Sequence, residues 1–120
     1  MQKTTLVIGA SPKPERYSFM ATKLLQEYQH PVVPFAKRKG VCAGLQIETD
    51  WDSNWEIDTV TLYINPVFQE DYIDAICALK PKRVIFNPGT ENPSFGSKLH
   101  NLGIEALEAC TLVLLRTGQY

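Results

Sequence analysis

The chain of 120 residues has the length of one domain, and 44% hydrophobic with 21% charged residues is the composition of an ordinary soluble globule. A formal net charge of −1 and a sequence pI of about 6.1 argue against nucleic acid as a partner. Three distant cysteines argue against a disulfide framework or a metal site, and the lack of a long apolar stretch argues against a membrane partner. We therefore expect a single cytoplasmic domain over residues 1–120.

The first third of the chain predicts two strands joined by a helix. Residues 5–8 are almost all apolar and end at Gly9, as in a strand that is buried on both faces. After a polar loop, six residues recur at the spacing of an amphipathic helix: Tyr17, Met20, Ala21, Leu24, Leu25 and Tyr28. Residues 31–35 predict a second strand, which its prolines place at a sheet edge or strand end.

The middle of the chain predicts another strand and helix. Residues 37–54 are irregular, with a short strand at 45–48, whereas residues 59–64 are rich in the β-branched and aromatic side chains of a strand. Pro66 begins a helix that ends before Pro81, because proline suits the first helical position. Its apolar face consists of Phe68, Tyr72, Ile73, Ile76 and Leu79.

The last third repeats the alternation. Residues 83–87 predict a strand, and Asn92 followed by Pro93 predicts the start of a helix that ends at Gly103. The apolar face of that helix consists of Phe95, Leu99 and Leu102. Residues 104–107 predict the last strand. Residues 110–116 have a strand-like composition, but we favour a short helix because a strand there leaves only a two-residue link.

Strands that alternate with helices predict an α/β fold of the Rossmann-like, doubly wound type, with a mostly parallel sheet and helices on both faces. Ligands of such folds bind beyond the carboxyl ends of the strands. Four loops follow predicted strands and are therefore expected at this edge: residues 9–14, 36–40, 65–66 and 87–92.

The first two of these loops favour a phosphate-bearing ligand over NAD. Ser11 and Pro14 replace the second and third glycines of the dinucleotide fingerprint, and no acidic residue follows the second strand to bind a ribose hydroxyl. Residues 37–39, Lys-Arg-Lys, stand there instead and suit a phosphorylated ribose. The alternative is that Gly9 makes a tight turn and the basic triplet is a solvated loop.

Charge is strongly segregated along the chain. Residues 1–40 carry seven Lys/Arg and two Asp/Glu, residues 41–79 carry eight acids and no Lys or Arg, and residues 80–120 carry five bases and three acids. Either these blocks are different solvated faces of one domain, or the basic first third faces an anionic ligand.

The loop at residues 87–92 is also open to two interpretations, as a well-capped turn or as a set of polar ligand contacts.

Four segments in this order resemble one family: residues 7–11 (VIGAS), 63–66 (YINP), 87–92 (NPGTEN) and 103–111 (GIEALEACT). The chain is similar to the small single-domain CoA-binding proteins, which share a Rossmann-like fold with the CoA-binding domain of the succinyl-CoA synthetase α subunit. The resemblance covers essentially the whole chain and implies CoA or an acyl-CoA as the ligand.

The resemblance also implies a place for each part of CoA. Around the pyrophosphate it places Gly9, Ala10, Ser11 and Lys13. Near the phosphate on the ribose it places Lys37, Arg38 and Lys39. Beside the adenine and ribose it places Ile64, Asn65 and Pro66. Along the pantetheine it places Asn87, Gly89, Thr90 and Glu91. One departure is the segment after the second strand, where family members often have an Asn-Pro turn and this chain has Phe-Ala-Lys at residues 35–37.

The sequence favours binding over catalysis. His30 and His100 are isolated, Cys110 has the features of an inert thiol, and Glu91 is the best single catalytic candidate. The phosphorylated histidine of the synthetase belongs to a domain that this chain lacks. We expect a non-catalytic or regulatory CoA-binding protein, with a protein partner left open. The alternatives are a small NADP-dependent or other nucleotide-dependent enzyme, and a protein-interaction module that has lost its ligand.

Overall fold

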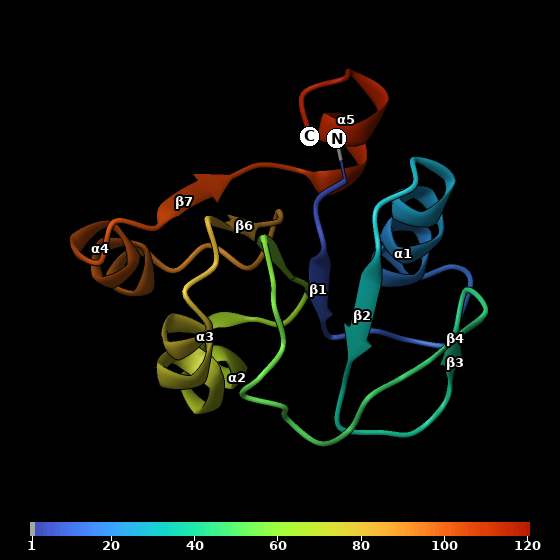
Figure 1. Ribbon diagram of the computed structural model, residues 1–120, viewed down its shortest axis with the longest axis horizontal. Coiled ribbons are helices and arrows are strands. Elements are labelled where there is room, and N and C mark those ends of the chain that lie inside the picture. The colour runs from blue at the N-terminus through green and yellow to red at the C-terminus, as the bar shows by residue number, and fades with distance from the viewer. Residues whose placement is uncertain (1) are drawn as a thin grey trace.

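A parallel sheet of five strands, in the order β2-β1-β5-β6-β7, forms the centre of the computed structural model, which describes residues 2–120 (Figure 1). Its strands are β1 (Thr5–Ile8), β2 (Val32–Phe35), β5 (Thr59–Leu62), β6 (Arg83–Phe86) and β7 (Glu105–Glu108). A hairpin of β3 (Val41–Cys42) and β4 (Leu45–Gln46) follows β2. The helices are α1 (Tyr17–Glu27), α2 (Pro66–Gln69), α3 (Ile73–Leu79), α4 (Pro93–Asn101) and α5 (Thr111–Arg116). The predicted Rossmann-like α/β class is confirmed.

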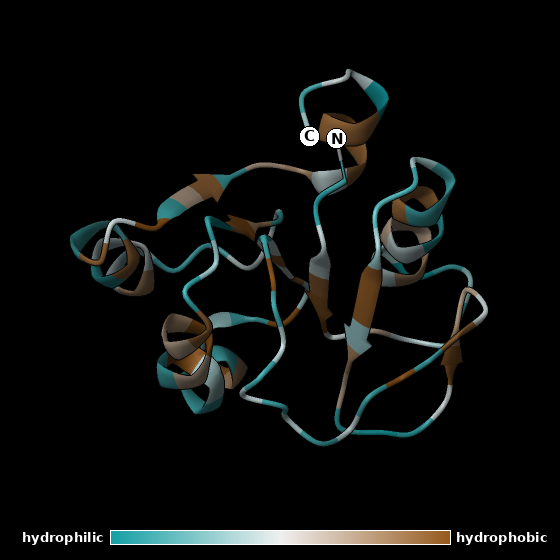
Figure 2. Cartoon of the chain, in the orientation of Figure 1, coloured by the Kyte–Doolittle hydropathy of each residue, from teal (hydrophilic) through white to brown (hydrophobic). Residues whose placement is uncertain are grey.

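Helices cover both faces of the sheet. On one face, alternate residues of β1, β5 and β6 pack with α3 and α4 into a continuous apolar core that includes Ile76, Phe95 and Leu99. On the other face, Val7 packs with Leu25 of α1 and Leu115 of α5. Figure 2 shows brown, hydrophobic segments on the strands and helices, whereas the loops at the lower edge are mainly teal, the hydrophilic colour. None of the helices among residues 2–120 has the length and apolarity needed to cross a membrane.

The strand register brings the functional edge together. Ile8 pairs with both Phe35 and Leu62, and Leu62 pairs with Phe86, so four strands end at the same level. The arrowheads of β1 and β2 point to this lower edge in Figure 1. The chain leaves β1 towards β2 and later returns on the other side of β1 to form β5. The strand order therefore reverses between β1 and β5, where ligands of open α/β sheets bind.

Several predicted elements differ in detail. The single helix predicted from Pro66 is divided into α2, a turn of 3₁₀-helix (Glu70–Tyr72) and α3, and the strand predicted at residues 45–48 is shorter and pairs with β3. Glu48 instead forms an isolated β-bridge with Phe35. This bridge covers the outer side of the edge strand β2. The helix favoured at residues 110–116 is confirmed as α5.

Four residues predicted on buried helix faces are exposed: Tyr17 (69%), Tyr28 (46%), Phe68 (53%) and Leu102 (57%). Tyr28 lies at the C-cap of α1, beyond the last helical residue. Leu102 lies at the C-cap of α4, past the last residue that the helix presses against the sheet. Tyr17 and Phe68 lie at the beginnings of helices that start at the carboxyl edge of the sheet, so their side chains project beyond the core. Both contact the cleft described below.

Candidate functional site

A cleft of about 780 Å³ opens at the carboxyl ends of β1, β2, β5 and β6, within the size range of cofactor sites. It is bounded by the loops that follow these strands and by the first turn of α1. Of the described residues that line it, five carry a basic side chain and none is Asp or Glu. The five are Lys13, Arg16, Lys37, Arg38 and Lys39. A cleft of this charge selects an anionic ligand.

Gly9 forms the floor of the cleft between β1 and the loop after β5. Its φ is +96°, and a Cβ at this position would lie 2.9 Å from Ile64 Cγ2 and 3.0 Å from the Tyr63 carbonyl oxygen. Only glycine fits this close approach. The backbone N–H groups of Gly9 and Ala10 both donate to the Phe35 carbonyl, at 2.9 and 3.1 Å, so they are not free to bind phosphate. Gly9 therefore lets the loop after β5 pack closely against the end of β1, and its N–H offers no hydrogen bond to a ligand.

The N-terminus of α1 supplies free donors beside this floor. Arg16 is the N-cap residue and makes no cap hydrogen bond with its side chain, and no acidic residue occupies the first turn. The N–H groups of the first turn have no intrahelical partners and carry the positive end of the helix dipole. Tyr17 and Ser18 of this turn line the cleft together with Arg16. This arrangement suits a phosphate group.

The basic triplet and an exposed aromatic residue face each other across the cleft. Lys37 Nζ lies 5.9 Å from the ring centroid of Phe68, and both residues line the cleft. The ring of Phe68 is half exposed at the start of α2, so it is open to contact with a planar group of a ligand.

Residues 48–58 form an acidic segment that contains Trp51 and Trp55 and supports the cleft from behind. Trp51 and Trp55 pack against Phe35 with ring centroids 5.2 and 6.0 Å apart, and Trp51 also stacks on Tyr72. Phe35 and Tyr72 line the cleft, whereas the two tryptophans do not. The segment therefore supports the wall of the cleft but does not line the cleft itself.

Most of the residues predicted to bind the ligand lie together. Those that line the cleft are Gly9, Ala10, Ser11, Lys13, Lys37, Arg38, Lys39, Ile64, Asn65, Gly89 and Thr90. Pro66, Asn87 and Glu91 do not line it. Arg16, Tyr17, Phe68 and Tyr72 line it and were missed, because their types and spacing are equally typical of a solvated or buried helix face.

The three predicted residues outside the cleft have structural contacts. Asn87 is buried, and its side chain donates to Thr61 Oγ1 and to the Leu62 carbonyl while it accepts from the Thr111 N–H. Glu91 is exposed and accepts a hydrogen bond from the Gly89 N–H. Pro66 is the first residue of α2. Asn87 and Glu91 thus hold the loop whose other residues reach the cleft.

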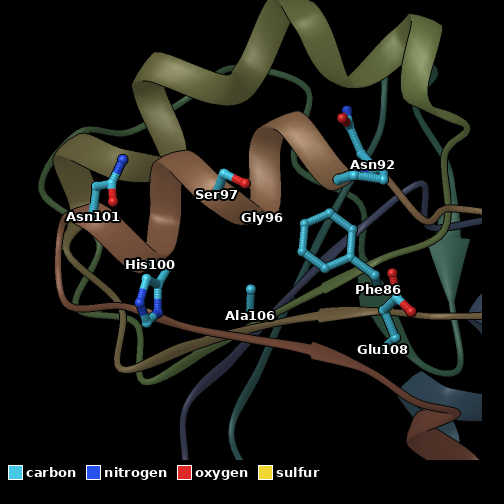
Figure 3. Close-up of a pocket in the computed structure, with 9 residues that line it drawn as sticks. Phe86, Asn92, Gly96, Ser97, His100, Asn101, Ala106 and Glu108 are labelled. Atoms are coloured by element: carbon cyan, nitrogen blue, oxygen red, sulfur yellow. The ribbon is translucent and has the colours of Figure 1, made fainter.

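A second groove, of about 560 Å³, lies between α4 and β7 (Figure 3). Ser97, His100 and Asn101 of α4 line one side, and Ala106 and Glu108 of β7 line the other. None of the predicted ligand-binding residues contributes to it. Nowhere within residues 2–120 do three His, Cys, Asp or Glu side chains gather in a group that could hold a metal ion.

Taken together, the sheet order and the cleft define an α/β protein with a basic cleft at its strand-order reversal. Residues 3–116 match the family model of the CoA-binding domain. The chain belongs to this CoA-binding domain family, as its resemblance predicted. A search of curated proteins finds no significant match.

Solved structures share this fold. One, described as an uncharacterized protein, is 42% identical with a TM-score of 0.97, and the match covers 100% of this chain and 99% of that one. A protein from Thermus thermophilus is 23% identical with a TM-score of 0.85, covering 99% and 91%. A hypothetical protein from Pyrococcus horikoshii is 25% identical with a TM-score of 0.83, covering 96% and 83%.

Proposed function

We propose that the protein binds CoA or an acyl-CoA in the cleft at the carboxyl ends of β1, β2, β5 and β6, as a binding or regulatory protein without catalysis. The observation that carries this proposal is the charge of the cleft, in which five basic side chains are matched by no acid among the described lining residues. CoA carries a pyrophosphate and a separate phosphate on its ribose, so it needs cationic groups at two places. The membership of the CoA-binding domain family supports the same ligand.

The pyrophosphate is proposed to lie over Gly9, Ala10 and Ser11, against the free N–H groups of α1 and the side chains of Lys13 and Arg16. Gly9, Ala10 and Ser11 line the cleft with no side chain or a small one, which supports a close approach of the ligand to the backbone. The donors then come from the helix N-terminus, because the Gly9 and Ala10 amides already bond Phe35.

The remaining parts of CoA follow the cleft outwards from the pyrophosphate. The ribose phosphate is proposed to lie at Lys37, Arg38 and Lys39, with the adenine and ribose beside Ile64, Asn65 and Pro66. The pantetheine is proposed to follow Gly89 and Thr90, with Asn87 and Glu91 acting on that loop from outside the cleft. The residues thus fit each charged part of CoA with a cationic group or a helix N-terminus.

Calorimetric titration of the purified protein with CoA, 3′-dephospho-CoA, NADP and NAD tests this proposal. We expect CoA to bind, and binding to weaken sharply when the 3′-phosphate is absent, because the basic triplet then loses its partner. Preference for NADP would favour a nucleotide-dependent enzyme. Binding of none of the four would overturn the proposal and favour a protein-interaction module.

A further inference from the structure

Gln69 is a fully buried polar side chain that follows the cleft residue Phe68 in the chain, yet it does not line the cleft. It is the last residue of α2 and is 0% exposed. Its Nε2 group donates to the Ile64 carbonyl at 2.9 Å and to the Thr90 carbonyl at 2.7 Å. Its Oε1 accepts from Asn92 Nδ2 at 3.0 Å. One side chain thus joins the loop after β5 to the loop after β6.

These two loops form opposite parts of the proposed CoA site. Ile64 lies on the adenosine side and Thr90 on the pantetheine side. Thr90 is also held from below, since its N–H and its Oγ1 both donate to the Asn87 carbonyl, at 2.9 and 2.8 Å. Gly89 has a φ of +91°, and a Cβ at this position would meet no atom within 4 Å, so packing does not fix this residue. The position of this wall therefore depends on hydrogen bonds.

We propose that Gln69 is a positioning residue that sets the distance between the adenosine and pantetheine walls of the cleft. The inference rests on the proposed function, because it assigns these two walls to parts of CoA. A neutral amide suits this task. It satisfies three buried polar groups without adding a charge beside the phosphates, whereas a carboxylate at the same place would face two carbonyl oxygens.

Gln69→Glu tests the inference, with Gln69→Leu as a second variant that removes the donors without adding charge. Gln26→Glu is the matched control, because Gln26 also donates to two carbonyls, those of Thr22 and Ala43, but lies outside the cleft. The ligands are CoA, which spans both walls, and adenosine 3′,5′-bisphosphate, which lacks the pantetheine arm.

We expect both Gln69 variants to weaken CoA binding by about tenfold, the effect of one or two lost hydrogen bonds, with a smaller change for the bisphosphate. In Gln69→Glu the ratio of CoA to bisphosphate affinity rises as the pH falls, because the protonated carboxyl regains a donor. Gln69→Leu shows no such recovery, and Gln26→Glu leaves the ratio at its wild-type value. An equal loss for both ligands would mean a general effect on folding and would overturn the inference.

Hydrogen exchange of the ligand-free protein separates this inference from the proposed function. We expect the Thr90 N–H to exchange faster in both Gln69 variants and at the wild-type rate in Gln26→Glu. Unchanged exchange in the Gln69 variants would overturn the inference whether or not CoA binds. If the wild-type protein binds neither ligand, the proposed function falls, and the role of Gln69 towards CoA falls with it.

Discussion

Trp51 stacks on Tyr72 with ring centroids 5.8 Å apart and 27° between the ring planes. Tyr72 is the last residue of the 3₁₀ turn and the N-cap of α3, and it lines the cleft, whereas Trp51 belongs to the acidic segment that precedes β5. The same tryptophan meets Phe35 edge-on at 5.2 Å. A segment without regular structure thus fixes two aromatic side chains that form the wall of the proposed CoA site.

Replacement of Trp51 by alanine is expected to lower the free energy of unfolding by about 2–3 kcal/mol, somewhat less than for a fully buried aromatic residue. CoA binding weakens as well, since Tyr72 and Phe35 lose their support. Trp51→Phe keeps a ring in the same place and should retain most of both properties. Urea denaturation and calorimetry measure the two effects, and an alanine variant with wild-type stability and affinity would contradict the role assigned to Trp51.

Gly9→Ala is expected to reduce both stability and CoA affinity. The new Cβ meets Ile64 Cγ2 and the Tyr63 carbonyl, which adds an overpacking cost of about 1–3 kcal/mol to the cost of the positive φ. Gly44→Ala is the matched control, because Gly44 has a φ of +85° and no atom within 4 Å of the added Cβ.

The control isolates the backbone cost, which is about 1 kcal/mol for a left-handed residue with a side chain. Denaturation curves of the two variants, compared with wild type, give the difference. Equal losses of stability in the two variants would show that the close approach at Gly9 is relieved by small movements and is not a constraint of the site.

Replacing Lys37, Arg38 and Lys39 together by alanine should reduce CoA affinity by about 10- to 100-fold, the range expected for one charge-assisted hydrogen bond. It should also remove most of the difference between CoA and 3′-dephospho-CoA. Lys23→Ala provides the control, since Lys23 is an exposed base on α1 outside the cleft. Calorimetry at two salt concentrations measures the change. A triple variant that still discriminates between the two ligands would place the ribose phosphate elsewhere.

His30 is expected to make stability depend on pH. Burial, together with the nearby charge of Lys3, lowers the pKa of His30 from its ordinary value of 6.5. Nδ1 of His30 accepts the Lys3 N–H at 3.0 Å, which requires this nitrogen to be unprotonated. The unfolded chain therefore takes up the proton at a higher pH than the folded protein does.

The sign of the effect follows from this difference. The contribution of His30 to the free energy of unfolding is full above pH 6.5 and is lost progressively as the pH falls below this value. The urea midpoint of the wild-type protein should decrease over that range, and His30→Gln, which does not titrate, should remove this part of the decrease. Identical pH profiles for the two proteins would exclude His30 as the cause.

Local sequence patterns were sufficient to predict the fold class and most of its elements. The signals that predicted them depend only on neighbours in the chain. They are the apolar run at residues 5–8, the helix start at Asn92-Pro93, and the alternation of strand and helix periodicity in the hydrophobic pattern. The same holds for the edge position of β2, because a proline in a strand has the same consequence wherever the strand lies. The break between α2 and α3 has no such local signal.

The tertiary structure decided which side chains meet at the cleft. No local pattern marks Arg16, which precedes α1, or Phe68 of α2 as site residues, and only the register of β1 with β5 brings them to the same edge. Asn87 illustrates the converse, since its turn-rich loop predicted a ligand contact and the fold uses its side chain to join β5 to α5.

The sequence by itself thus determined the alternation of strands and helices, the glycine after β1 and the excess of basic residues in the first third, because each depends on residue type and spacing. Only the tertiary structure decided that the acidic segment lies behind the cleft and that Gln69 joins its two walls. Both arrangements depend on contacts between residues far apart in the chain, for which spacing along the sequence carries no information.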